Sequence, residues 1–438
     1  MTELLAGTAS VDITPNLGCH MCGYFTDRVA SNIHDPLLVR AIVLRAGDTT
    51  LGFVVCDVID VPVEVVAAAK ARIQQLTGVP PQNVLISATH THTGPSIVGA
   101  LGTPKEEKYG QDTAPRIADA FAMALQRLQP AQVAMAAGDC TGEVHNRRWH
   151  MKDGSVRMNP GYENPDKVRP AGPTDPQLGL MIVRTPQRQP IAVFANLALH
   201  YVGVGGSKEH SWISADYFAE FGKALQRCAG AEFTTILANG CQGNINNCDF
   251  TKPGRSSPHP YAQIERVANV VAAEAWKVWN TLREEDFRSD VTLDARLATV
   301  RFKARTATSE ELAKAREQLA GEAKPADMEW AYARELVLLS ELPAEWDVPV
   351  HALRVGDLGI VGLHGEVFCE IGLDVKARSP FRQTMVVGLA NGSAGYIATD
   401  KAMDEGSYET RLCRHVRAPK GTGQLWADTA VKLLGEMK

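Results

Sequence analysis

The chain of 438 residues lacks the features that mark membrane, disulfide-rich and nucleic-acid-binding proteins. It has no apolar run near the ~20 residues that a bilayer-spanning helix needs, so no stable membrane insertion is expected. Residues 1–7 carry neither the basic flank nor the long apolar core of a secretion signal, which predicts a cytoplasmic location. The net charge is −5 and no long basic run occurs, which argues against nucleic acid as a partner.

Cysteine is also sparse. Nine cysteines form no dense disulfide framework in a chain of this length, and an odd number leaves at least one thiol unpaired. Cys19 and Cys22 have the spacing of a zinc knuckle or a redox pair, but no second Cys-x-x-Cys pair exists, so buried reduced thiols are expected. The composition is ordinary for a globular protein, and at this length the chain can bury a large core and build a deep cleft for a small-molecule substrate. The sequence leaves the oligomeric state open.

Short apolar, β-branched runs alternate with helical stretches along the chain. This alternation predicts an α/β fold with layered mixed β-sheets flanked by helices. Strands are expected at 39–44, 51–56, 84–88, 132–137, 191–199, 233–238, 350–355, 359–363 and 384–389, and helices at 61–77, 116–128 and 217–228. Because no repeat and no linker composition occur, residues 1–438 are expected to form a single domain.

Two stretches depart from this alternation. Residues 144–185 are rich in Pro, Gly, Arg and Asn and show little periodicity, which predicts a long loop. Residues 308–345 are charged and rich in Ala, Glu and Leu, which predicts two exposed helices broken at Pro325. We expect this second stretch to be a helical insertion beside the core.

Two histidines follow the expected strand at 84–88 and precede a Gly94-Pro95 turn. In extended geometry His90 and His92 point to the same side, because side chains alternate with a period of two. One ring is then able to bind a metal while the other faces a substrate. The alternative is that both are hydrogen-bonded polar residues in a turn.

Further metal-ligand types end two other expected strands. His200 follows the strand at 191–199, and His364 and Glu366 follow the strand at 359–363. A catalytic zinc takes His nitrogens and a carboxylate gathered from separate elements. A lone His after a strand is more often a structural hydrogen-bonding residue, but three such strand ends together favour a metal site.

These residues lie in segments that resemble the N-terminal amidase domain of the neutral/alkaline ceramidases. Residues 87–95, Ser-Ala-Thr-His-Thr-His-Thr-Gly-Pro, are similar to the family's Ser-Ala-Thr-His-Thr-His-Ser-Gly-Pro. Similar pieces follow in the same order: His34 in an Ile-His-Asp-Pro-Leu run, Asn146-Arg147, His200, Gly365-Glu366, the segment 391–397, and Tyr408 twelve positions after Tyr396. The resemblance spans nearly the whole chain.

The resemblance implies a hydrolase that uses Zn²⁺-activated water to cleave the acyl C–N (amide) bond of a small or medium-sized N-acyl substrate. It places the zinc ligands at His90, His200, Glu366 and Tyr396, and further cleft residues at His92, Arg147 and Tyr408. In this interpretation His92 is the general base, and Arg147 and Tyr408 donate hydrogen bonds to the oxyanion.

Two departures from the family pattern bear on the substrate. Asn246 stands where the family has an active-site Ser, and it is expected either to position a water or substrate carbonyl, or to be only an Asx-turn residue. The chain also ends before the family's C-terminal immunoglobulin-like domain, so we expect a short homologue. The alternatives are a zinc-dependent esterase, lactonase or glycan-processing hydrolase, or a non-catalytic, metal-stabilised binding protein.

Overall fold

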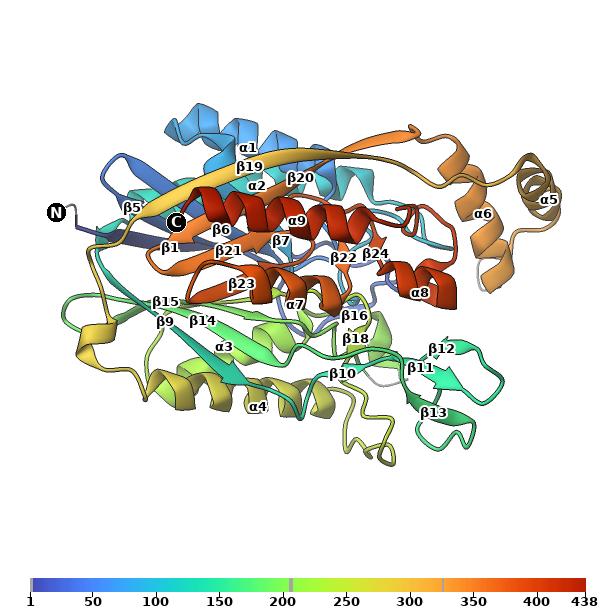
Figure 1. The fold of residues 1–438 in the computed structure, drawn as a ribbon, viewed down its shortest axis with the longest axis horizontal. Helices are drawn as coiled ribbons and strands as arrows, with labels where there is room; N and C mark the ends of the chain where they lie inside the picture. Colours follow the sequence, from blue (N-terminus) through green and yellow to red (C-terminus); the bar gives the residue numbers. More distant parts are fainter. Residues whose placement is uncertain (1–2, 205–207, 325–326) are drawn as a thin grey trace.

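Three units of the same topology follow one another along the chain (Figure 1). The computed structural model describes residues 3–204, 208–324 and 327–438. In each unit three antiparallel strands are followed by a helix and by a fourth strand, which lies parallel to the third, and then by another helix. The sequence shows no matching repeat, so the units share topology alone.

Strands and helices follow the same order within each unit. The first comprises β1 (Leu5–Asp12), β5 (Leu38–Ala46), β6 (Thr49–Cys56), α1 (Val63–Thr77), β7 (Val84–Ala88) and α2 (Glu107–Gln126). The second comprises β9 (Gln132–Asp139), β14 (Gln177–Arg184), β15 (Pro190–Leu197), α3 (Asp216–Ala229), β17 (Thr234–Asn239) and α4 (Ala262–Trp279). The third comprises β19 (Leu293–Lys303), β20 (Glu345–Val355), β21 (Leu358–Gly362), α7 (Cys369–Arg378), β23 (Gln383–Val387) and α9 (Thr422–Glu436).

Shorter elements lie in the connections. They are β2 (His20–Met21), β3 (Arg28–Val29), β4 (Asn32–Ile33), β8 (Gln129–Pro130), β10 (His145–Asn146), β11 (Arg148–Met151), β12 (Val156–Met158), β13 (Lys167–Pro170), β16 (Trp212–Ile213), β18 (Ile245–Asn246), α5 (Ser309–Leu319), α6 (Met328–Ser340), β22 (Glu366–Val367), β24 (Tyr396–Ile397) and α8 (Asp400–Glu405). None of the helices in the described ranges has the length and apolarity needed to cross a bilayer.

One hydrophobic core joins the three sheets. It contains Phe53 from the first sheet, Phe194 from the second and Ile360 from the third, all fully buried. The rings of Phe53 and Phe194 lie 5.3 Å apart. The opposite face of each sheet packs against the helices of its own unit in a separate core. The three sheets therefore pack against one another at the centre of the protein, and the helices cover their outer faces.

The long connections of all three units lie at one edge. The first, third and fourth strands of a unit run in the same direction, so the segments that leave them emerge on the same side. The hairpins at the other edge span only residues 47–48, 185–189 and 356–357. Figure 1 shows the start of β1 and the C-terminal end of α9 on the left, away from α6, α8 and the β11–β13 segment on the right. In α/β sheets the carboxyl ends of parallel strands are where ligands bind.

The predicted α/β class is confirmed, but two expectations about elements were wrong. The stretch 144–185 is not one long loop, because it ends in β14, a central strand of the second sheet. This strand is buried along nearly its whole length, so its apolar run lacks the alternation of a half-buried strand. The predicted helix at 116–128 begins earlier, at Glu107, and contains Pro115.

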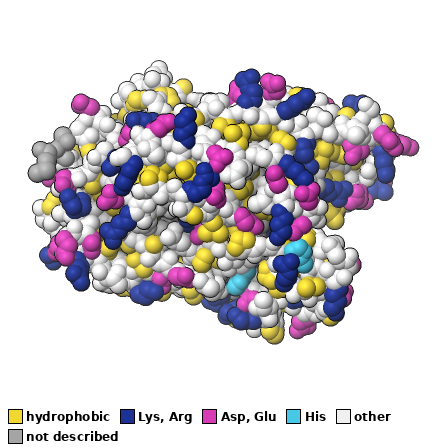
Figure 2. Space-filling model, viewed as in Figure 1, with side chains coloured by type: hydrophobic (Ala, Val, Ile, Leu, Met, Phe, Trp, Pro, Cys, Tyr) yellow, Lys and Arg dark blue, Asp and Glu magenta, His cyan; other side chains and the backbone are white. Residues whose placement is uncertain are grey.

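Between residues 308 and 345 the structure has α5 and α6, which end before β20 begins at Glu345. The predicted break at Pro325 falls outside the described residues. Over the face drawn in Figure 2, Lys and Arg side chains alternate with Asp and Glu side chains, with no basic stripe.

The central core gives a stability prediction. Phe194→Ala removes a ring that contacts two sheets, so we expect it to lower the free energy of unfolding by about 3–5 kcal/mol. The control Leu297→Ala changes a side chain that is 44% exposed on β19 and should cost less than about 0.5 kcal/mol. Urea unfolding followed by fluorescence measures both. Equal losses would contradict a core shared by the sheets.

Candidate metal centre

His90 and His92 lie just beyond β7, in the connection that leads to α2. His90 has a positive φ of 73°, a strained conformation that persists where the surroundings enforce it. Its Nδ1 lies 2.6 Å from the carbonyl oxygen of Ile59, and Nδ1 of His92 lies 2.8 Å from that of Gly23. A carbonyl oxygen only accepts, so in both rings Nδ1 donates its proton. In the neutral form of both rings Nε2 is therefore the acceptor, the atom able to take a metal or a proton.

His200 joins this pair from the second unit, just beyond β15. Its Nε2 lies 3.3 Å from Nε2 of His92, and one ring nitrogen from each of the three histidines lies within 4.8 Å of the others. All three rings are buried, and burial lowers the pKa of His92 and His200 well below the ordinary value. Both rings are therefore neutral near pH 7, the state in which imidazole binds a metal.

Glu366 contributes a carboxylate from the third unit. Its Oε2 lies 3.3 Å from Nε2 of His90 and has no hydrogen-bond partner among the described residues. Burial opposes the charged form of both groups, but their mutual attraction raises the pKa of His90 and lowers that of Glu366. Because Nδ1 of His90 is bonded to a carbonyl, its Nε2 and Oε2 are two acceptors facing each other. Only a shared proton or a shared cation makes that contact favourable.

Tyr396 lies beside Glu366 because β22 and β24 pair in parallel, with these two residues in register. The close approach requires glycine at 365, since a Cβ there would lie 2.4 Å from the carbonyl oxygen of Gly395. The Tyr396 hydroxyl accepts a hydrogen bond from Nη2 of Arg147 at 3.1 Å. Burial raises the pKa of Tyr396 well above its ordinary value.

Arg147 is buried behind the site. Its guanidinium donates to Glu409, to the Gly243 carbonyl and to Tyr396, and Nη1 lies 3.3 Å from Nδ1 of His200. Glu409 is fully buried and also accepts from Arg148. Through these contacts Arg147 holds the side chains of Tyr396 and His200 from behind.

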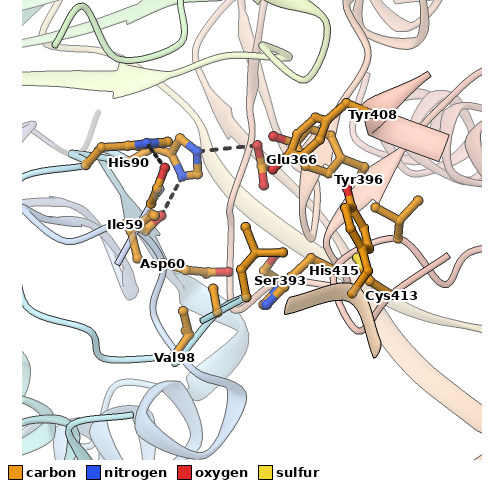
Figure 3. A pocket seen from close by; sticks show the side chains of 16 residues that line it. Ile59, Asp60, His90, Val98, Glu366, Ser393, Tyr396, Tyr408, Cys413 and His415 are labelled. Atoms are coloured by element: carbon orange, nitrogen blue, oxygen red, sulfur yellow. Dashed lines mark hydrogen bonds and ion pairs between the residues drawn. The ribbon is translucent and has the colours of Figure 1, made fainter. Parts of the chain in front are cut away.

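A cavity of about 60 Å³ lies against this cluster (Figure 3). Of the residues predicted for the site, His90, His92, Glu366, Tyr396 and Tyr408 line it. Those that do not line it are His200 and Arg147, which contact the lining residues from behind, and Asn246. The three units thus bring six of the seven implied zinc-site and cleft residues into one connected cluster, and Tyr408 lies on the cavity wall next to Tyr396.

Asn246 is held away from this cavity by its own contacts. Its amide nitrogen donates to Asn159 at 2.7 Å, and its amide oxygen accepts from the backbone N–H of Cys248 at 2.9 Å. The second bond, two residues along the chain, is that of an Asx turn. Both ends of the side chain are occupied in the structure.

Three polar cavity residues were not predicted from the sequence: Asp60, Ser393 and His415. The sequence position of Asp60 could have identified it, because it follows β6, and β6 is the parallel neighbour of β7, the strand that precedes His90. Burial raises the pKa of Asp60 to about 7. Ser393 and His415 lie in the connection after β23 and have no strand-end spacing that singles them out.

The donor set fits a divalent cation. Imidazole Nε2 atoms in the acceptor form, a carboxylate oxygen without a hydrogen-bond partner among the described residues and a buried setting are what a zinc site with nitrogen and oxygen ligands requires. The rings are oriented by backbone carbonyls, as is usual around metal-binding histidines.

The fold has solved counterparts. A ceramidase solved in complex with C2 superposes with a TM-score of 0.78 and 18% sequence identity, covering 100% of this chain and 75% of that chain. The chain has the ceramidase fold. The neutral ceramidase from Pseudomonas aeruginosa superposes with a TM-score of 0.73 and 19% identity, with the same coverage. Neither family models nor curated proteins gave a match to the chain. The resemblance predicted from residues 87–95 is thus confirmed at the level of the fold.

The His90–Glu366 contact predicts how metal affinity depends on pH. A proton and a cation compete for Nε2 of His90, whose pKa is raised, so apparent zinc affinity should fall about tenfold per pH unit below that pKa. His92 and His200 have lowered pKa values and add no further slope near neutral pH. Competition titration against a chromophoric chelator measures the slope. An affinity that does not change between about pH 8 and pH 5 would contradict this centre.

Proposed function

We propose that the protein is a zinc-dependent amidase that hydrolyses N-acyl substrates to a carboxylic acid and an amine. The observation that carries the proposal is the convergence of the His90 and His92 lone pairs and the Glu366 carboxylate on one buried cavity. The ceramidase fold adds support, because proteins of that name cleave an N-acyl amide.

In this proposal His90, His200, Glu366 and Tyr396 hold the zinc. Bound there, zinc supplies a Lewis acid that lowers the pKa of water and polarises a carbonyl. The Glu366 carboxylate offsets part of the metal's charge, which weakens its effect on water and makes a nearby base more important. The donor atoms come from three units, so the site is complete only in the folded chain.

His92 is the base in this proposal. Its Nδ1 donates to the Gly23 carbonyl, so Nε2 is the atom that would accept a proton from water and pass it to the departing amine. Its lowered pKa keeps it neutral and able to accept near pH 7. The Tyr408 hydroxyl, on the cavity wall, donates to the carbonyl oxygen as negative charge develops there. Arg147 holds Tyr396 and His200 in place from behind.

An apolar hollow of about 790 Å³ adjoins the cavity and gives the acyl chain a place. The two share Tyr332 and Tyr408 in their walls, and Phe25, Met328 and Met403 line the outer hollow. Tyr332 and Met328 belong to α6, so the helical segment between β19 and β20 forms part of the entrance. A small or medium acyl group fits this hollow, since apolar walls exclude water from an apolar chain.

The proposal predicts about one zinc per chain and hydrolysis of N-acyl amides that is lost on chelation and restored by zinc. Glu366→Ala should lose the metal and the activity, whereas the control Glu341→Ala, an exposed acid on the surface, should keep both. Elemental analysis and product assays on amides, esters and lactones provide the measurements. Cleavage of esters or lactones alone would replace the amidase by an esterase, and no cleavage at all would favour a binding protein.

Two glycines test the role of His92. A Cβ on Gly23 would lie 2.7 Å from Nδ1 of His92, so Gly23→Ala should displace the ring and lower kcat by at least about 100-fold while zinc stays bound. Gly18→Ala is the matched control, because Gly18 also has a positive φ but a Cβ there meets nothing within 4 Å. Loss of zinc from the Gly23 variant alone would instead identify His92 as a metal ligand.

A further inference from the structure

The ring of Tyr201 stacks on the imidazole of His92 beside the metal centre. The two ring centroids lie 3.6 Å apart and the ring planes differ by only 14°. Tyr201 is not among the residues that line the cavity, so it is not placed to contact a substrate there. The proposed mechanism assigns it no role, although it directly follows the proposed zinc ligand His200 in the chain.

A second tyrosine contacts the same imidazole. The rings of Tyr24 and His92 are perpendicular, with an interplanar angle of 90° and centroids 5.8 Å apart. The hydroxyl of Tyr201 donates to the hydroxyl of Tyr24 at 3.1 Å. The guanidinium of Arg28 lies over the Tyr24 ring and also donates to the backbone carbonyl of His92. Two linked aromatic rings therefore contact His92 from different directions.

The backbone that carries Tyr201 is fixed by Asp216. The backbone N–H groups of Val202 and Gly203 donate to the Asp216 carboxylate at 3.3 and 2.8 Å. Asp216 is buried and has a φ of 59°, a conformation that costs free energy and persists where the surroundings enforce it. Gly203 leaves room for the aromatic ring, because a Cβ at this position would lie 2.7 Å from the Tyr201 side chain. These contacts hold the Tyr201 ring in a fixed position.

The imidazole of His92 depends on such support for its orientation. Its Nδ1–H donates to the Gly23 carbonyl, which restrains one atom of the ring. The torsion that turns a histidine ring has a broad energy minimum, so this restraint alone leaves the ring plane free to tilt. Nε2 is the atom that accepts the proton in the proposed mechanism, and a misplacement of about 1 Å is enough to slow a reaction about 100-fold. Stacking on Tyr201 limits this tilt.

We propose that Tyr201 is a positioning residue for the reaction, whose ring, anchored through Asp216, fixes the plane of His92 and aims Nε2 at the cavity. The inference rests on the proposed amidase function, in which His92 is the base, and adds a residue to it. The segment after β15 then has two roles, because residue 200 holds the metal and residue 201 orients the base. The base and the metal ligand are thereby kept in a constant relation to each other.

Removal of the Tyr201 ring tests this role. In Tyr201→Leu, kcat for octanoyl para-nitroanilide should fall at least about tenfold, because Nε2 of His92 is no longer held toward the attacking water. KM should change by less than about threefold and zinc should stay bound, since Tyr201 does not line the cavity. Tyr201→Phe keeps the stack and loses only the hydroxyl, so its kcat should stay within about threefold of the wild type.

The chain has a matched histidine–tyrosine stack elsewhere. Tyr261 stacks on His34 with the ring centroids 3.5 Å apart and an interplanar angle of 11°, and neither residue lines the cavity. Tyr261→Leu therefore removes an equivalent stack and should leave kcat unchanged. Full activity or loss of zinc in Tyr201→Leu, or an equal loss of kcat in Tyr261→Leu, would overturn the proposal. A Tyr201→Phe variant as slow as Tyr201→Leu would also overturn it, because the hydroxyl would then matter and not the ring.

A glycine provides a second variant in case Tyr201→Leu does not fold. Gly203→Ala retains the tyrosine but places a Cβ against its ring, so kcat should again fall at least about tenfold. Gly421→Ala is the matched control, because both glycines have a φ of 81° but a Cβ at 421 meets nothing within 4 Å. Wild-type kcat in Gly203→Ala would contradict the positioning role.

Failure of this inference is distinguishable from failure of the proposed function. If the zinc-loaded protein cleaves no amide, the amidase proposal fails, and NMR of carbon-labelled histidine still reports the stack. A ring stacked on His92 shifts the imidazole C–H signal upfield, and absence of this signal from His92→Gln assigns it. The signal should move downfield in Tyr201→Leu and stay in Tyr201→Phe, which would support the fixing of the ring alone. A His92 signal that does not move in Tyr201→Leu would overturn it.

Discussion

The arrangement of the cavity depends on the contact between His90 and Glu366. Two buried groups from different units face each other at 3.3 Å, and the backbone carbonyl of Ile59 takes the only proton that a neutral His90 ring has to offer. Such a contact is stable only when a proton or a metal ion lies between them. The strained backbone of His90 and the glycines around Glu366 and Tyr396 are costs that this arrangement imposes.

The three-unit architecture explains how distant residues reach that point. Each unit sends its long connections to the same edge, so strand ends from all three surround one cavity. The opposite edge has the short hairpins and the connections that lead from the helices to the next strands. The sheets share a core between the two edges, which separates the part that stabilises the protein from the part that carries polar, strained and incompletely paired groups.

Much of this site was predictable from strand ends alone. His90, His200 and Glu366 each follow an apolar run, and parallel strands bring such positions to one edge. The family resemblance added Tyr396, Arg147 and Tyr408, which lie in segments without that signal. Asp60 shows the same strand-end pattern and was missed, whereas His415 depends on how the third unit's last connection folds back against β24. The repeated topology was not predicted, because the three units share the direction and burial of their strands but no recognisable sequence repeat.

The division of the donor atoms among the units has a consequence for synthesis of the protein. Residues 90, 200 and 366 emerge from the ribosome in that order, and the carboxylate that faces His90 is made last. A nascent polypeptide that stops short of the third unit therefore offers imidazoles but no counter-charge, so the proposed zinc site would hold its ion tightly only after that unit has been translated. Maturation of the centre is tied to synthesis of the third unit.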